Sequence, residues 1–114
     1  MNSITLTGRL TADPEVRATK TGTAIGEFRL AVRRRSREGE DRGAVYVDVV
    51  CFGRLAESCG VYLSKGRQVA ASGRLELDEW ETEGGERRSR HKVVANELEF
   101  LGGRREGREG EEDR

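Results

Sequence analysis

The sequence predicts one small all-β domain with a single short helix, and three observations support this prediction. Apolar and polar residues alternate over several segments, which is the pattern of strands with one buried face. The 114 residues include 15 glycines and 1 proline, a composition typical of short twisted strands joined by turns. Apolar residues take helical spacing only between Gly53 and Gly66. A chain of this length buries one core, so one domain is expected.

Period-2 alternation gives the position and the buried face of each expected strand. The strands are predicted at residues 4–10, about 24–34, about 44–53, about 67–81 and about 89–101. In the second of these, Phe28, Leu30 and Val32 alternate with charged residues, so they are assigned to the core. Gly8 and Gly73 interrupt the apolar rows of the first and fourth strands, where we expect the sheet to bend.

Turn-forming residues mark the connections between these strands. Pro14 fixes its own φ and disfavours helical geometry at the residue before it, so the first strand must end there. Residues 11–23 are then expected to form a loop that turns at residues 20–22. Residues 36–43 and 84–85 are interpreted as hairpin loops.

One helix between the third and fourth of five strands is the order of the OB-fold, a small Greek-key barrel that binds oligonucleotides. Leu55, Cys59 and Leu63 supply its apolar spacing. An open meander packed on the helix, or another small barrel, would satisfy the same periodicities. The element order therefore favours the OB-fold without deciding for it.

The two cysteines are interpreted as small core residues in a reducing compartment. Cys51 and Cys59 form no CxxC pair, and His91 is the only histidine, so a metal site lacks ligands. No cofactor is expected.

Charge and composition limit the classes of partner. The 21 basic and 21 acidic residues cancel, which disfavours a purely electrostatic nucleic-acid binder, so the distribution of charge must carry that argument. Hydrophobic residues make up only 34%, which favours an oligomer whose subunits share buried surface. The N-terminus enters a strand at once and no apolar run approaches bilayer length, so the sequence predicts a cytoplasmic protein without a membrane segment.

Several motifs occur in an order that resembles the bacterial single-stranded DNA-binding proteins over residues 2–103. They are Asp13-Pro14-Glu15-Val16-Arg17, Leu30-Ala31, the run from Tyr46 to Glu57, the run from Tyr62 to Gly66, and Gly73-Arg74-Leu75 leading to Trp80. The resemblance implies an OB-fold in residues 1–103 and a homotetramer that associates with the nucleoid. It also implies sequence-independent binding and protection of unpaired DNA in replication, recombination and repair, without catalysis.

The resemblance also implies which residues contact DNA. The expected base-stacking residues are Tyr46, Phe52 and Trp80. The expected phosphate-binding residues are Arg33, Arg34, Arg35, Arg37, Arg54, Lys65, Arg87 and Arg88. From the pattern alone, Tyr46 or Phe52 could instead be core residues. Trp80 shares its face with Glu76 and Asp78, so we expect its indole to face solvent. The sequence places Trp80 at the end of the strand next to that of Tyr46.

The chain departs from the family pattern at three places. The stretch before Trp80 reads Glu76-Leu77-Asp78-Glu79 where well-known members are basic, and Ser36 stands where they have a further tryptophan. Residues 104–114, expected to be a disordered charged tail, lack the acidic Pro-Phe tip that recruits replication and repair enzymes. Either this is a short paralogue or the chain has been shortened.

Two other functions stay open at this point. One is a different nucleic-acid-binding OB module, either a primosomal partner or an RNA binder. The other is an oligomeric scaffold with weak or lost DNA binding, which the neutral net charge and the acidic residues before Trp80 favour.

Overall fold

The computed structural model describes residues 1–35, 37–39 and 41–102, so Ser36 and the expected tail lie outside the described residues. Its strands are β1 (Ile4–Leu10), β2 (Glu15–Ala18), β3 (Ala24–Arg35), β4 (Asp41–Phe52), β5 (Gln68–Glu81) and β6 (Arg87–Leu101). The helix α1 (Arg54–Tyr62) lies between β4 and β5. The all-β class, the five expected strands and the place of the helix are confirmed.

The strand β2 was not expected, and the prediction of a plain loop over residues 11–23 was wrong in this part. Residues Glu15–Ala18 pair antiparallel with the start of β3. The expected turn does form, because the Thr19 and Thr23 backbones are joined by an N–H to O hydrogen bond of 2.8 Å and Gly22 donates to Thr19 at 2.9 Å. A turn this tight brings the chain back alongside itself and makes a hairpin.

The strands form a ring. Their order is β1-β5-β6-β4-β3-β2, and β1 also pairs with β3 at Arg9 and Leu10. All pairs are antiparallel except β4 with β6, which run parallel at Asp48–Val50. The five expected strands thus surround one interior, as in the small barrel predicted. One detail differs: β6 lies between β4 and β5, so Trp80 and Tyr46 are not on neighbouring strands.

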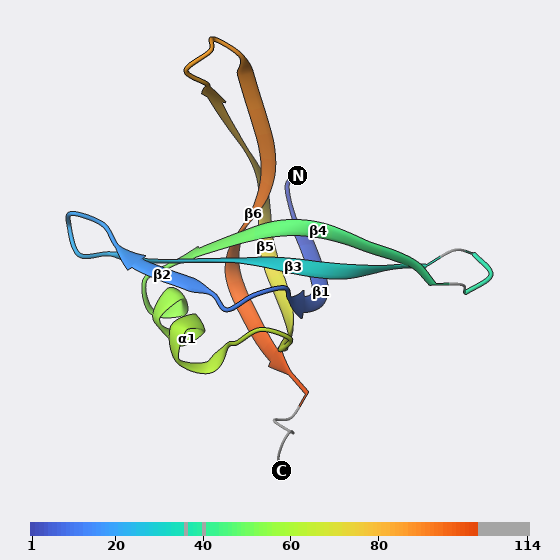
Figure 1. Ribbon diagram of the computed structural model, residues 1–114. Helices are drawn as coiled ribbons and strands as arrows, with labels where there is room; N and C mark the ends of the chain where they lie inside the picture. Colours follow the sequence, from blue (N-terminus) through green and yellow to red (C-terminus); the bar gives the residue numbers. More distant parts are fainter. Residues whose placement is uncertain (36, 40, 103–114) are drawn as a thin grey trace.

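Two long hairpins extend beyond this ring. Figure 1 shows the β3–β4 hairpin running across the view and the β5–β6 hairpin rising from it, while α1 packs beneath β2, β3 and β4. We call residues 75–92 of the second hairpin the β5–β6 arm. The apolar row of β5 continues into it, since Val69 and Ala71 are buried in the barrel whereas Leu75 and Leu77 are 40% and 48% exposed.

Gly73 lies where β5 leaves the barrel and enters the arm. The β5–β6 register shifts between Ser72 and Gly73. A Cβ atom at Gly73 would lie 2.0 Å from the carbonyl oxygen of Val94, so only glycine fits this close approach. The bend expected from the sequence therefore coincides with a tight backbone contact.

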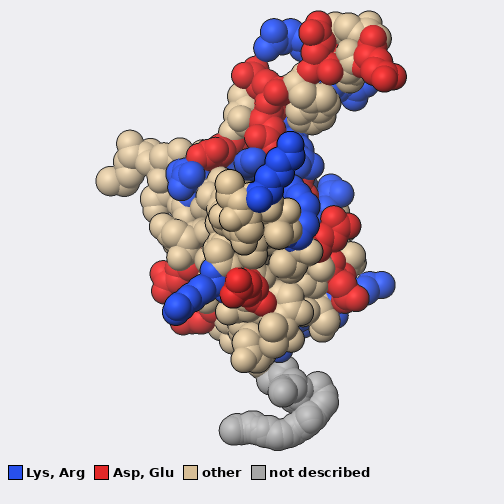
Figure 2. All heavy atoms as spheres, turned by 90° about the vertical axis from the view of Figure 1, so that its left-hand side faces the viewer, with Lys and Arg blue, Asp and Glu red and all other residues tan. Residues whose placement is uncertain are grey.

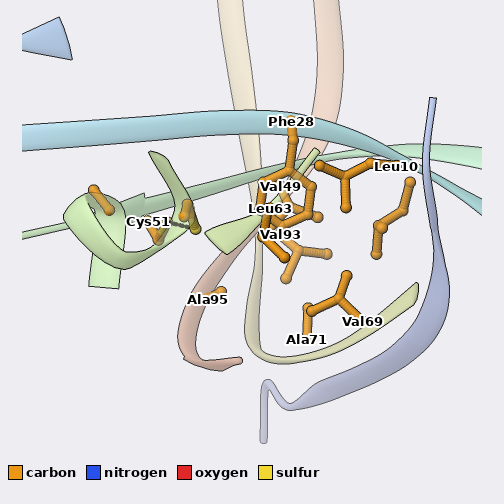
Figure 3. Packing of buried hydrophobic residues seen from close by; sticks show 12 residues of the cluster. Leu10, Phe28, Val49, Cys51, Leu63, Val69, Ala71, Val93 and Ala95 are labelled. Carbon is orange, nitrogen blue, oxygen red and sulfur yellow. Dashed lines mark hydrogen bonds between the residues drawn. The ribbon is translucent and has the colours of Figure 1, made fainter. Parts of the chain in front are cut away.

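The core fills the ring and the space beneath it. Figure 3 shows Phe28 of β3 pointing toward Val49, Leu63 and Val93, all of which are buried. Cys51 and Cys59 are completely buried free thiols with their sulfur atoms 3.4 Å apart. The hydrogen bond with Cys51 and burial raise the pKa of the Cys59 thiol, so it stays protonated at neutral pH. The interpretation of both cysteines as core residues is confirmed.

Candidate nucleic-acid interface

Strand register places a set of aromatic and charged residues on one outward face. Arg29 of β3 pairs with Asp48 of β4, and Asp48 pairs with Lys92 of β6. On the next pair, Asp78 of β5 faces Arg90 of β6. Paired residues project to the same side of a sheet, so these side chains form one surface across four strands. We call it the outer face.

The three predicted stacking residues are exposed to solvent. Tyr46 is 56% exposed, and Phe52 and Trp80 are each 47% exposed, so none of them is a core residue. The guanidinium carbon of Arg29 lies 5.2 Å from the centroid of the Tyr46 ring, within the range of a cation–π contact. Aromatic rings with a free face and a nearby cation are what base stacking and phosphate binding require.

Three surface hollows connect Tyr46 with Trp80 across the outer face. The hollow beside Tyr46 is lined by Thr11, Arg29 and Tyr46. The next also includes Thr11 and Arg29, and extends to Arg90 and other residues. The third is lined by Asp78, Glu79, Trp80 and Arg90. Each hollow shares lining residues with the next, so the three adjoin one another, and we call this series of hollows the path between the two aromatic side chains.

Four charged residues in the middle of this path form a compact network, which we call the charge quartet: Asp48, Asp78, Arg90 and Lys92. Arg90 Nη1 lies 3.3 Å from Asp48 Oδ2, and Arg90 Nε lies 3.9 Å from Asp78 Oδ2. Lys92 Nζ lies 3.0 Å from Asp78 Oδ2. The quartet carries no net charge, and its side chains are between 22% and 50% exposed.

Phe52 and several predicted cations lie away from this path. Phe52 is six residues from Tyr46 along β4, about 20 Å, although both face the same side. Arg54 begins α1 and is exposed. Lys65 is exposed and lies beside the path rather than away from it, because its backbone N–H donates to Asp13 Oδ1 at 2.8 Å and Asp13 lines the middle hollow.

The other predicted cations belong to the two long hairpins. Arg33, Arg34 and Arg37 are exposed, and the side chain of Arg35 lies outside the described residues. Arg88 is in register with Trp80, and its guanidinium is 2.9 Å from Glu86. Arg87 contacts Glu79 at 3.8 Å. Figure 2 accordingly shows acidic and basic side chains interspersed over the β5–β6 arm.

Other site types find no support in the described part of the chain. It contains no group of three or more histidine, cysteine or acidic residues that could hold a metal ion. Within the same residues, no helix has the length and apolar character needed to span a membrane.

The comparison with known proteins agrees with this geometry. Residues 1–101 match the family model described as "Single-strand binding protein family". The chain belongs to this family. It is 46% identical over 103 residues to a single-stranded DNA-binding protein of Clostridium tetani, covering 89% of this chain and 70% of that protein. It is 44% identical over 103 residues to one of Thermotoga maritima, covering 88% and 73%.

Within this member of the single-strand binding protein family, three residues of the path were not assigned to the site from the sequence. In the sequence, Arg29 is one of the charged residues that alternate with Phe28 and Leu30, and Arg90 and Lys92 follow the predicted cations Arg87 and Arg88. Their place beside one another depends on pairing between distant strands, Arg29 with Asp48 and Lys92 with Asp48 and Glu76. The sequence feature that could have indicated Arg90 and Lys92 is the equal spacing of basic residues on β6 and acidic residues on β5.

Proposed function

We propose that this protein binds single-stranded DNA without sequence preference and protects unpaired DNA during replication, recombination and repair. The observation that carries the proposal is the path of hollows from Tyr46 to Trp80, with Arg29, Arg90 and Lys92 along it. Membership of the single-strand binding protein family supports it. The relatives from Clostridium tetani and Thermotoga maritima are named as single-stranded DNA-binding proteins.

In this proposal the bases stack on exposed rings while the phosphates follow the basic side chains. Stacking is tolerant of sequence because every base has a π-face, and each stacked base contributes about 1–3 kcal/mol. Phe52 extends the stacking surface along β4, and the exposed arginines of the β3–β4 hairpin extend the phosphate contacts. The protein's work is then thermodynamic, since binding the unpaired form shifts the strand equilibrium by mass action.

The proposed assembly is a homotetramer, and the proposed location is the cytoplasm in association with the nucleoid. Support for assembly comes from apolar residues that a single copy leaves in water: Val45, Leu75 and Leu77 are 50%, 40% and 48% exposed. They belong to strand rows whose other members are core residues, so a second copy is their natural cover.

Titration of Trp80 fluorescence with oligo-dT tests the proposed function, because the chain contains 1 tryptophan. Stacking on the indole should quench the emission, and raising the salt concentration should weaken binding. Duplex DNA of equal length should compete poorly. Preferential binding of a matched RNA oligonucleotide would instead identify an RNA-binding module, because the 2′-hydroxyl is the distinguishing contact. No binding to any of these would favour the scaffold.

A further inference from the structure

The two cations of the charge quartet already have anionic partners in the free protein. Within the charge quartet, Lys92 Nζ lies 3.0 Å from Asp78 Oδ2, and Arg90 contacts both Asp48 and Asp78. Asp78 is the residue shared by both cations. Its side chain is 37% exposed, so solvent and ligands reach it.

The quartet also lies where a bound strand must pass. Arg90 lines the hollow beside Trp80 and the hollow that leads to Arg29. A nucleic acid that contacts both Tyr46 and Trp80 therefore places its backbone over Arg90. The phosphates then meet a neutral cluster rather than two free cations.

We infer that Asp78 competes with DNA phosphate for Lys92 and Arg90, and thereby limits the affinity and the salt dependence of binding. This inference rests on the proposed function and deepens it. A phosphate that pairs with Lys92 must displace the carboxylate of Asp78 or share the ammonium group with it. The released carboxylate stays beside the DNA, where it repels phosphate or takes up a cation from solution.

The competition changes how many ions are exchanged on binding. Each phosphate neutralised by a free cation releases counterions and contributes a slope of about −0.7 to log affinity against log salt for a single strand. A cation taken up by the released carboxylate offsets part of that release. The wild-type slope should therefore be shallower than the number of contacting cations implies.

The substitution Asp78→Asn tests this inference, since it removes the charge and keeps the size of the side chain. We expect oligo-dT affinity at low salt to rise about two- to fivefold, the range set by partly exposed ion pairs. The magnitude of the salt slope should increase by about 0.7. Asp48→Asn, which removes one of the two carboxylates that contact Arg90, should give a smaller gain in the same direction.

Glu99→Gln is the matched control, because it also removes one negative charge from an exposed position. Glu99 lies on β6 nine residues from Arg90, about 30 Å along the strand. If Asp78→Asn and Glu99→Gln raise the oligo-dT affinity equally, the effect depends only on net charge and the inference is wrong.

The Lys92→Ala background separates competition from simple repulsion. If Asp78 acts by occupying Lys92, the gain from Asp78→Asn should shrink when Lys92 is absent. If Asp78→Asn raises the oligo-dT affinity by the same factor in the Lys92→Ala background, the inferred competition is wrong. The proposed function is tested separately by the wild type: binding of oligo-dT by the wild type with no change in Asp78→Asn refutes this inference alone, whereas no binding by either protein refutes the function.

Discussion

At the scale of single residues, Trp80 combines exposure with a position at the end of the path of hollows. Its indole is 47% exposed, so the side chain contributes little to the core. Trp80→Ala should cost about 1–3 kcal/mol of binding free energy per stacked base, whereas Trp80→Phe should retain part of the affinity. Anisotropy of a labelled oligo-dT measures both, and thermal unfolding should show melting temperatures close to that of the wild type.

Tyr62→Ala is a suitable control for the tryptophan substitution. Tyr62 is an aromatic residue, 60% exposed, that lies on α1 and packs against Phe100, with ring centroids 6.1 Å apart. Its removal should leave oligo-dT affinity unchanged. Unaltered affinity in Trp80→Ala would instead mean that binding depends on Tyr46, Phe52 and the basic hairpins.

Gly73 connects local backbone geometry with the position of the arm. In Gly73→Ala the new Cβ would lie 2.0 Å from the Val94 carbonyl oxygen, so β5 and β6 must separate locally. We expect a loss of about 1–3 kcal/mol in the free energy of unfolding, as for other overpacked sites. Chemical denaturation measures it. Gly84→Ala is the control, because its Cβ would find nothing closer than Thr82 Oγ1 at 3.9 Å; equal losses in both variants would contradict the steric explanation.

At the scale of secondary-structure elements, the β3–β4 hairpin carries exposed arginines beyond the barrel. If Arg33 and Arg34 contact phosphates, the double substitution to alanine should reduce the magnitude of the salt slope by about 1.4, which is two contacts at 0.7 each. Oligo-dT titrations at several salt concentrations measure the slope. The double substitution to lysine keeps both charges and should keep the slope. An unchanged slope in the alanine variant would show that these arginines are only solvated surface.

The elements that alternation predicted are those with one buried face. β1 and β3 alternate because Leu10, Phe28 and Leu30 enter the core. β2 was missed because all of its residues are exposed, so burial imposes no period on its sequence. The outer face was predicted only in part, since the contact between Arg29 and Tyr46 and the charge quartet depend on register between strands. Alternation fixes which side a residue faces, but not which residue of another strand lies opposite.

At the scale of the whole molecule, the apolar row of β5 supports the proposed assembly, because a single copy leaves part of this row in water. Val69 and Ala71 are buried in the barrel, while Leu75 and Leu77 continue the same row into water along the arm. Covering a leucine side chain contributes up to about 1.5–3 kcal/mol, in proportion to the apolar area removed from water. Symmetric association of copies repeats this contribution at every equivalent position.

The assembly prediction follows from this row. Sedimentation of the wild type at micromolar concentration should give about four times the chain mass of 12.7 kDa. Leu77→Glu places a charge in the proposed contact and should shift the population toward smaller species at the same concentration. Val61→Glu adds the same charge at a residue of α1 that is 72% exposed, and it should sediment like the wild type. A monomeric wild type would refute the tetramer. A tetrameric Leu77→Glu variant would show that the copies contact one another elsewhere, and assembly would then not explain the exposed leucines of the arm.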